Sequence, residues 1–356
     1  MVDDRVYTAI VLQGGGALGA YEFGVLKALY EQRPGFTPVA VAGISIGAIN
    51  AAVLGGAKTN PVDALDTLWR DRLTVSTPWS RWLPRPLDAS WALMGNPGMY
   101  LINPGLFVSP WTSTSLYDTA PLRWTLADLV DPVRLNDEGT RVIVGAIRVG
   151  TGEIDYFDLD CPGGLTLDHV VASGSLPPMF PMTSLDQQCY WDGGLFANTP
   201  LGPAINALER AAGGAADVVR ELIVVELFPM KGAVPSNLLQ VHQRRQHLQY
   251  TSRMNLDHKF FEKMNGVVDV ISEIDAAIGD HAIRNNPVYA QLRGHRKINH
   301  YNVVTAALTP ELGNAGDFSA SAIDARIEAG YLDALNQGVG RVDSTGLRPG
   351  VLKAST

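Results

Sequence analysis

The sequence has few cysteines and no long apolar run. Cys161 and Cys189 are its two cysteines in 356 residues. They are too few for a disulfide framework and too far apart for a zinc or redox motif, so we expect buried, reduced thiols. No apolar run approaches the roughly 20 residues that span a bilayer. Residues 1–5 (MVDDR) carry acids where a signal peptide is basic. These absences predict a soluble, cytoplasmic protein whose contact with membranes is at most transient.

Basic clusters are also absent. The formal net charge is -8, and no long run of Lys or Arg occurs. This balance argues against a nucleic-acid partner or a polybasic membrane footprint. With 46% apolar and 18% charged residues, a chain of this length can bury a large core, which argues against extensive disorder.

The first 60 residues alternate apolar strands with helices. Residues 7–12 (YTAIVL) read as a strand buried on both faces, and a helix is expected over 17–30. A second strand over 39–42 leads through Gly43 into a helix of small residues at 46–54. This β-α-β-α order predicts a parallel sheet with helices packed on it.

Helical and strand periodicity is lost over about residues 77–124, where Pro, Gly, Ser and Trp accumulate. The tryptophans are Trp79, Trp82, Trp91, Trp111 and Trp124. We interpret the segment as an insertion. It could form a lid or a lipid-contacting surface, because Trp combines a large apolar face with one polar group. Packing over the core is the interpretation we favour.

Regular patterns return after residue 140. Strands over 141–149 and 154–159 flank Gly150-Thr151-Gly152, which is typical of a hairpin. Further elements are expected as helices at 167–175, 204–212, 236–278 (interrupted near Asn265-Gly266) and 319–336, and as strands at 188–191, 221–227 and 303–308. The sum is a three-layer α/β sandwich with a mainly parallel central sheet in residues 1–230. A mostly helical C-terminal extension follows at 231–356.

Gly43-Ile44-Ser45-Ile46-Gly47 fits the nucleophile-elbow pattern G-x-S-x-G. The pattern lies between a predicted buried strand and a helix, as the motif requires. Gly43 and Gly47 permit the sharp turn and the close approach of neighbouring chain. Ser45 would then project from the sheet edge at the positive N-terminus of its helix.

Gly14-Gly15-Gly16 follows the preceding strand, so its N–H groups are expected at the same sheet edge as the elbow. Together with the N–H of Ile46, they could bind the oxyanion of a tetrahedral intermediate. The alternative is a dinucleotide fingerprint, Gly14-x-Gly16-x-x-Gly19. That motif expects an acid at the end of the second strand, where this chain has Ser45, so we disfavour it.

A serine nucleophile needs a base. An α/β-hydrolase would supply a histidine, but that fold places several strands before its elbow, and here one β-α unit precedes Ser45. We interpret the seven histidines as structural or surface residues: His169, His242, His247, His258, His281, His295 and His300. Asp192, followed by Gly193 and Gly194, ends a predicted strand. Enclosure in an apolar pocket would raise its pKa and make it a base, although an ordinary Asp-Gly-Gly turn fits the same residues.

Four blocks of this sequence resemble the patatin-like phospholipase family. Residues 13–19 (QGGGALG) look like its glycine-rich oxyanion loop, and 43–50 (GISIGAIN) look like its elbow and following helix. Residues 172–181 (ASGSLPPMFP) are similar to its small-residue and proline segment. Residues 191–194 (WDGG), with Asn198 and Pro200, resemble its Asp-Gly-Gly block. The blocks span about residues 7–227.

The resemblance implies a Ser-Asp dyad, with Ser45 forming an acyl-enzyme and Asp192 acting as base. It further implies hydrolysis of a lipid or lysophospholipid ester, with no metal and no cofactor. Many relatives have Arg or Lys after the glycine triplet, where this chain has Ala17, so preference for an anionic head group is not implied. The alternatives are a Ser-His-Asp esterase or thioesterase and a catalytically silent binding protein.

Overall fold

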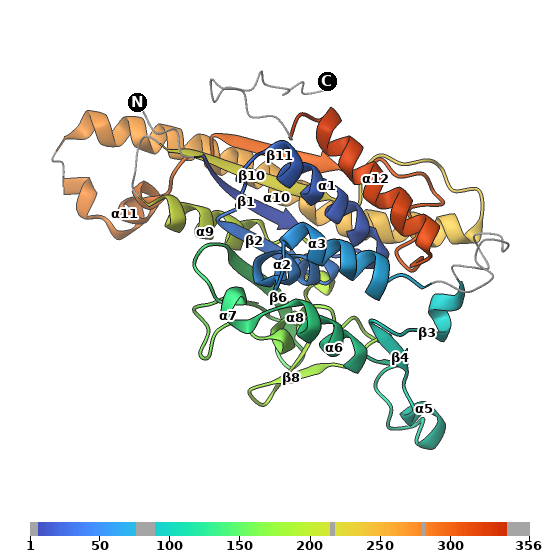
Figure 1. Ribbon diagram of the computed structural model, residues 1–356. Coiled ribbons are helices and arrows are strands. Elements are labelled where there is room, and N and C mark those ends of the chain that lie inside the picture. Colours follow the sequence, from blue (N-terminus) through green and yellow to red (C-terminus); the bar gives the residue numbers. More distant parts are fainter. Residues whose placement is uncertain (1–5, 76–89, 214–217, 280–281, 340–356) are drawn as a thin grey trace.

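The computed structural model describes residues 6–75, 90–213, 218–279 and 282–339. Within these ranges the main sheet has eight strands (Figure 1). The strands are β1 (Val6–Leu12), β2 (Ala40–Ile44), β6 (Arg141–Arg148), β7 (Ile154–Phe157), β8 (Thr183–Leu185), β9 (Gln188–Asp192), β10 (Val219–Glu226) and β11 (His300–Thr305). Their order is β11-β10-β1-β2-β6-β9-β8, with β7 also paired to β6. The first five strands of this order are parallel, whereas β7, β8 and β9 are antiparallel to their neighbours.

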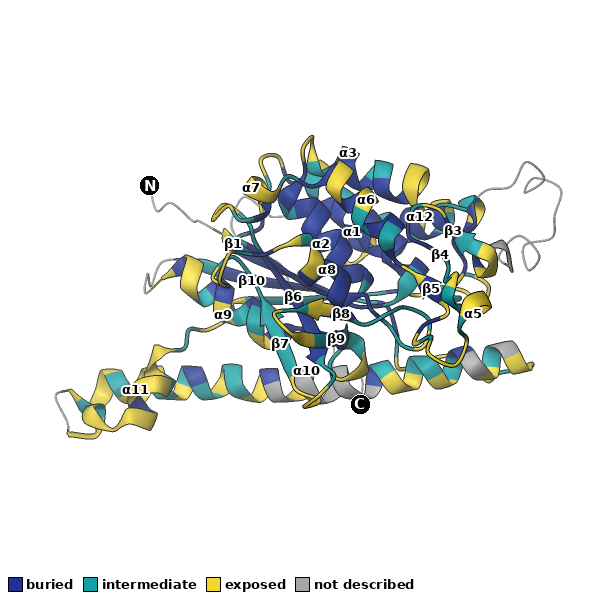
Figure 2. Cartoon of the chain, turned by 90° about the horizontal axis from the view of Figure 1, so that it is seen from below, coloured by how far each residue is buried: buried dark blue, intermediate teal, exposed yellow. Residues whose placement is uncertain are grey.

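Helices cover both faces of the sheet (Figure 2). One face carries α1 (Gly19–Gln32), α2 (Ile46–Gly56), α3 (Pro61–Asp66), α6 (Ala120–Leu129), α7 (Pro132–Leu135), α8 (Leu167–Ser173) and α12 (Ala320–Asn336). The other face carries α9 (Leu201–Ala212) and α10 (Leu238–Ile278). The predicted three-layer α/β fold with a mainly parallel sheet is therefore confirmed, and each predicted strand lies within about three residues of its observed position.

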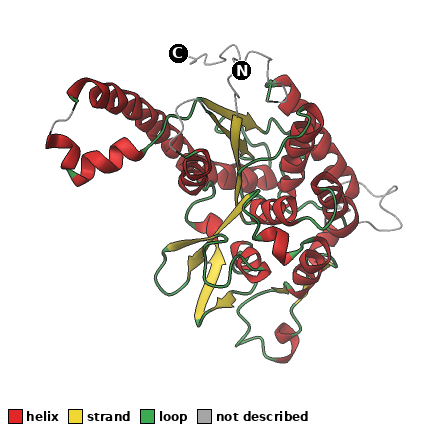
Figure 3. Cartoon of the chain, turned by 60° about the vertical axis from the view of Figure 1, so that its left-hand side comes forward, coloured by secondary structure: helices red, strands yellow, loops and turns green. Residues whose placement is uncertain are grey.

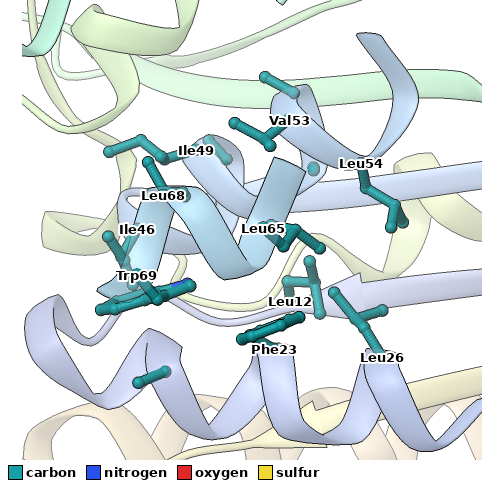
Figure 4. Packing of buried hydrophobic residues seen from close by; sticks show 14 of the residues in the cluster. Leu12, Phe23, Leu26, Ile46, Ile49, Val53, Leu54, Leu65, Leu68 and Trp69 are labelled. Carbon is teal, nitrogen blue, oxygen red and sulfur yellow. The ribbon is translucent and has the colours of Figure 1, made fainter. Parts of the chain in front are cut away.

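The core has two sides because successive strand residues point to opposite faces of the sheet. Leu12 of β1 packs with α1, α2 and the π-helical segment Thr67–Arg72 that continues α3, where Phe23, Ile46 and Trp69 are buried (Figure 4). Val11, its neighbour, packs instead toward α9 and α10. Both faces of β1 are thus apolar, which explains the continuous apolar run in the sequence.

The last two described elements complete the central layers. β11 pairs in parallel with β10, and α12 lies along α1 (Figure 1). The helices approach closely at Gly24 and Gly330, because a Cβ at either position would lie 2.0 Å from a backbone oxygen of the other helix. The far half of α10 and α11 (Pro287–Gly294) extend beyond the sheet (Figure 3).

Three expectations about individual segments were wrong. α10 continues through Asn265-Gly266 without interruption, because an exposed glycine weakens a long helix without breaking it. Cys161 and Cys189 are free but partly exposed. Trp111 and Trp124 are 94% and 69% exposed, so they do not pack over the core as we favoured. Trp79, Trp82 and the side chain of Trp91 lie outside the described residues.

The remainder of the Trp-rich segment forms a small sheet and a short helix. The sheet contains β3 (Gly95–Asn96), β4 (Tyr100–Ile102) and β5 (Tyr117–Asp118), and α5 (Gly105–Val108) lies between β4 and β5. In the parts of the chain that the structure describes, no helix is both long and apolar enough to cross a membrane.

Candidate active site

Ser45 lies in the turn between β2 and α2, with a φ of 56° and a ψ of -122°. A positive φ strains any residue with a side chain and costs on the order of 1–3 kcal/mol. The turn is held by close contact: a Cβ on Gly43 would lie 2.2 Å from Gly47 O, and one on Gly47 would lie 2.6 Å from Leu12 O. The N–H of Ser45 donates to Ser173 Oγ at 3.0 Å. The sequence thus builds the expected strand-turn-helix around Ser45.

Asp192 is the last residue of β9 and is 2% exposed. Burial raises the pKa of its carboxyl group to about 6, although hydrogen bonds from the Ser45 side chain and the Gly194 N–H favour the ionised form. The Gly194 N–H donates to Asp192 Oδ1 at 2.7 Å. Gly193 packs against the backbone of β6, where a Cβ would lie 2.5 Å from Gly145 O. Ser45 and Asp192, 147 positions apart in the chain, therefore lie close enough for the serine side chain to favour the ionised carboxylate, and both line the same cavity.

The glycine loop lies directly beside Ser45. A Cβ on Gly14 would be 2.8 Å from the Cβ of Ser45, so only glycine permits this approach. The N–H of Gly14 donates to Asn198 Oδ1 at 3.1 Å, and Asn198 Nδ2 donates back to Gly14 O at 2.8 Å. Gly14 therefore fastens the loop and does not present its N–H to a ligand. No acceptor among the described residues takes the N–H groups of Gly15, Gly16 or Ile46.

A buried arginine of α12 holds the outer side of this loop. Arg326 is fully buried and donates to the carbonyl oxygens of Leu312 (2.9 Å), Asn314 (2.8 Å) and Asp317 (2.6 Å). These bonds hold the segment 312–317 in place. Within it, Ala315 O accepts the N–H of Ala17 at 2.8 Å. Burial lowers the pKa of Arg326 to about 10. The residues that follow the glycine triplet are thus positioned from the C-terminal part of the chain.

A cavity of about 350 Å³ opens beside the pair. Its polar edge contains predicted site residues: Gly14, Gly15, Gly16, Ser45, Asp192 and Gly194. Its remaining walls are mostly apolar and include Met99, Tyr100, Leu176, Met179, Phe180, Phe228 and Phe318. Among the described residues that line it, Asp192 is the one charged side chain. Ile46 begins α2 next to Ser45, while Gly43, Gly47 and Gly193 pack behind the cavity.

No described histidine side chain lines this cavity. His169 stacks on Phe157 and accepts the N–H of Thr166, His247 packs against Phe228, and His295 pairs with Glu209. These are structural surroundings, as expected. The side chains of His242 and His258, and all of His281, lie outside the described residues.

Sequence reasoning missed the part of the site that α10 and the segment 314–316 contribute. Tyr250 of α10 lines the cavity close enough to Asp192 for the carboxylate charge to raise the tyrosine pKa, although burial is the larger cause. Asn314, Ala315 and Gly316 form a further wall. No short motif marks these residues, because tertiary packing alone brings them to the sheet edge.

The fold and the site together define a class of protein: a three-layer α/β protein with a strained G-x-S-x-G turn between β2 and α2, at the carboxyl edge of the parallel strands. Within this class, the model of the patatin-like phospholipase family matches residues 10–205, more than half of the chain. The chain therefore belongs to the patatin-like phospholipase family, an enzyme family of lipid-ester hydrolases.

Among characterised proteins, the chain is similar to a cGAMP-activated phospholipase of Pseudomonas aeruginosa. The two are 28% identical over 206 residues, covering 54% of this chain and 54% of the relative. The chain thus spans about half the length of the curated relative that it matches.

Solved structures give two further likenesses. VipD from Legionella pneumophila is 15% identical with a TM-score of 0.41, covering 93% of this chain and 66% of VipD. The ExoU–SpcU complex from the type III secretion system of Pseudomonas aeruginosa gives 14% identity and a TM-score of 0.32, covering 87% of this chain and 68% of the matched chain.

Proposed function

We propose that this protein hydrolyses carboxylic esters of lipids, with Ser45 as nucleophile and Asp192 as the base. The observation that carries the proposal is the pairing of a strained, partly exposed serine with a buried carboxylate at the edge of an apolar cavity. A strained turn keeps the serine oxygen pointed at the cavity, and a carboxylate with a raised pKa is a stronger base than an ordinary aspartate.

In the first step, Ser45 Oγ attacks the ester carbonyl carbon while Asp192 accepts the hydroxyl proton. The carbonyl oxygen becomes an oxyanion, and its collapse expels the alcohol, which takes the proton from Asp192. In the second step, Asp192 removes a proton from water, which attacks the acyl-enzyme. Ser45 leaves with that proton, and a fatty acid is released. Each step returns Asp192 to its ionised form, so no histidine is required.

The oxyanion site in this mechanism consists of backbone donors. We assign it to the N–H groups of Gly15, Gly16 and Ile46, because Gly14 donates to Asn198. Ile46 begins α2, where the positive end of the helix dipole also favours an anion. Position 17, where many members of the family carry Arg or Lys, is Ala17 in this chain, so no side-chain charge at this position stabilises the oxyanion.

The lining of the cavity supports an apolar acyl group as substrate. Its walls combine methionine, leucine and aromatic side chains, which would bury a hydrocarbon chain without unpaired polar contacts. No described cation lines it, so the proposal extends to lipid and lysophospholipid esters without preference for an anionic head group.

The test is hydrolysis of a p-nitrophenyl ester and of a lysophospholipid by the wild-type protein and Ser45→Ala, with labelling by a fluorophosphonate probe. We expect Ser45→Ala to lose turnover and labelling while it remains folded by circular dichroism. Full activity in Ser45→Ala would refute the assignment. A wild-type protein that neither turns over ester nor is labelled would instead indicate a silent binding protein.

Replacement of each histidine in turn distinguishes the proposed Ser-Asp dyad from a Ser-His-Asp esterase or thioesterase. A Ser-His-Asp esterase would lose activity in one histidine variant and retain it in Asp192→Asn. The dyad predicts the reverse result.

A further inference from the structure

The chain between β4 and β5 forms an arm that stands out from the body of the protein. We define the arm as residues 103–116, with α5 at its outer end (Figure 1). The surrounding sequence, residues 89–117, contains no Asp, Glu, Lys, Arg or His. Part of this uncharged segment is buried, as at Met99 and Tyr100, but its outer residues are exposed, in a protein whose composition is 18% charged.

The outer end of the arm carries large apolar side chains in water. Phe107, Val108 and Trp111 are 79%, 85% and 94% exposed. They fall within five consecutive residues, so they form one exposed group and not scattered positions. Ser109 and Thr112, between and beside them, supply hydroxyl groups. Such a group of apolar side chains with small polar neighbours marks an interaction surface.

Hydrogen bonds at its base give the arm a defined shape. The Asn103 N–H donates to Leu116 O at 2.9 Å, which joins its two strands. The Asn103 side chain accepts the N–H of Gly105 at 2.9 Å and donates to Ser115 O at 3.1 Å. The apolar end is therefore presented by an ordered hairpin.

The base of the arm is continuous with the wall of the candidate active site. The N–H groups of Leu116 and Tyr117 donate to Pro178 O (3.0 Å) and Met179 O (2.9 Å). Tyr100 of β4 contacts Phe180 with ring centroids 5.2 Å apart, and Tyr100, Met179 and Phe180 all line the cavity. A surface that engaged the arm would thus lie next to the cavity that contains Ser45.

We propose that the end of the arm inserts into the interface of a lipid membrane and brings the cavity to its ester substrate; this proposal rests on the proposed function. Trp and Phe at an exposed tip favour the boundary between head groups and acyl chains. Because the arm has no cation and the protein carries a net charge of -8, the surface that it fits is zwitterionic and not anionic.

The first test measures binding to phosphatidylcholine vesicles by co-sedimentation, in the Ser45→Ala background so that the vesicles stay intact. We expect Phe107→Ser/Trp111→Ser to weaken partitioning by roughly tenfold or more, because each side chain buries apolar surface on insertion. Binding should be unchanged between 0.1 and 0.5 M salt, since apolar insertion is not screened. Val133→Ser removes an 80% exposed valine from α7, away from the arm, and should leave binding unchanged.

The second test measures activity with Ser45 intact. Phe107→Ser/Trp111→Ser should hydrolyse a soluble short-chain ester at the wild-type rate and lose roughly tenfold on vesicles. Vesicle binding and vesicle activity equal to those of the wild-type protein would overturn the proposal. It would also be overturned if light scattering found a wild-type dimer that becomes a monomer in Phe107→Ser/Trp111→Ser, because the arm would then be a contact between copies of the chain. Failure of the proposed function would look different, since the wild-type protein would then be inactive on the soluble ester as well.

Discussion

At the scale of single residues, the decisive balance is that between burial and hydrogen bonding at Asp192. Two donors favour its carboxylate, yet burial outweighs them and raises the pKa to about 6. An acid in this range is ionised at neutral pH and still accepts a proton readily, which is the compromise that a general base needs. The strained backbone of Ser45 adds a further free-energy cost to the folded state.

The pKa of Asp192 predicts how activity depends on pH. Because the base must be ionised, kcat/KM should rise with pH through about 6 and remain constant above about 7. Asp192→Asn should lose roughly 10²–10⁴-fold and show no such step. The measurement is the pH profile of p-nitrophenyl ester hydrolysis from pH 4.5 to 8.5. A midpoint near 4, or an unchanged profile in Asp192→Asn, would contradict the assignment.

The free energy of unfolding of Asp192→Asn provides a control for its loss of activity. A raised pKa means that the folded protein binds the proton more tightly than the unfolded chain, so stability is lost as pH rises from about 4 to about 6. At 1.36 kcal/mol per pH unit, the ionised carboxyl costs about 3 kcal/mol. Asp192→Asn should therefore be more stable than the wild-type protein at pH 8 in urea denaturation. An inactive variant that is also less stable would indicate a structural role alone.

The sequence allowed the candidate residues to be proposed but not all of their contacts. Ser45 and Asp192 lie in short motifs at strand ends, so both could be proposed as candidates. Their approach could not be deduced from a parallel sheet, because β9 runs antiparallel to β6. The partner of the Gly14 N–H could not be predicted, because Asn198 is 184 positions away and reaches it through tertiary packing. Tyr250 carried no signal for the same reason.

At the scale of secondary-structure elements, patterns dictated by burial were predictable and long-range supports were not. β1, β2 and β10 are buried on both faces, so their apolar runs were unambiguous. The segment 312–317 has no regular pattern, and its conformation depends on the carbonyl contacts of Arg326. The local sequence of this segment therefore could not predict its conformation.

Arg326 gives the prediction at this scale. Arg326→Met should reduce the free energy of unfolding by about 3 kcal/mol, because it removes the donor from the buried carbonyl oxygen of Asp317 and from the partly buried ones of Leu312 and Asn314. In the fraction that stays folded, kcat should fall more than KM changes, since the loop that carries Gly15 and Gly16 loses its outer support. Urea denaturation and steady-state kinetics at 10–15 °C test the two effects.

A second arginine serves as the control, because its replacement removes a positive charge without removing contacts to backbone carbonyl oxygens. Arg123, 39% exposed, pairs with Asp168 at 2.7 Å on the surface. Arg123→Met should cost less than about 1 kcal/mol, as exposed ion pairs usually do. Equal effects of the two substitutions would refute the role given to Arg326.

At the scale of the whole molecule, the two ends of the described chain are joined across the central layers. Arg33 and Glu221 form a buried pair, 2.6 Å apart at their nearest atoms, and Arg33 also donates to Val339 O. Tyr21 of α1 donates to Asp333 of α12 at 2.7 Å. Polar contacts of this kind at the end of α12 imply that the C-terminal helix folds together with the sheet.

The contact between α1 and α12 provides the last prediction. A Cβ on Gly330 would lie 2.0 Å from Tyr21 O, so Gly330→Ala must separate the two helices and should destabilise the protein by about 3 kcal/mol. Gly266→Ala is the matched control, because Gly266 lies within α10 and a Cβ there meets no atom within 4 Å. That change should stabilise the protein by about 0.5–1 kcal/mol through helix propensity alone. Urea denaturation followed by circular dichroism measures both. If Gly330→Ala were as stable as the wild-type protein, α12 would be a loosely attached appendage, and the support that Arg326 gives to the glycine loop would lose its structural basis.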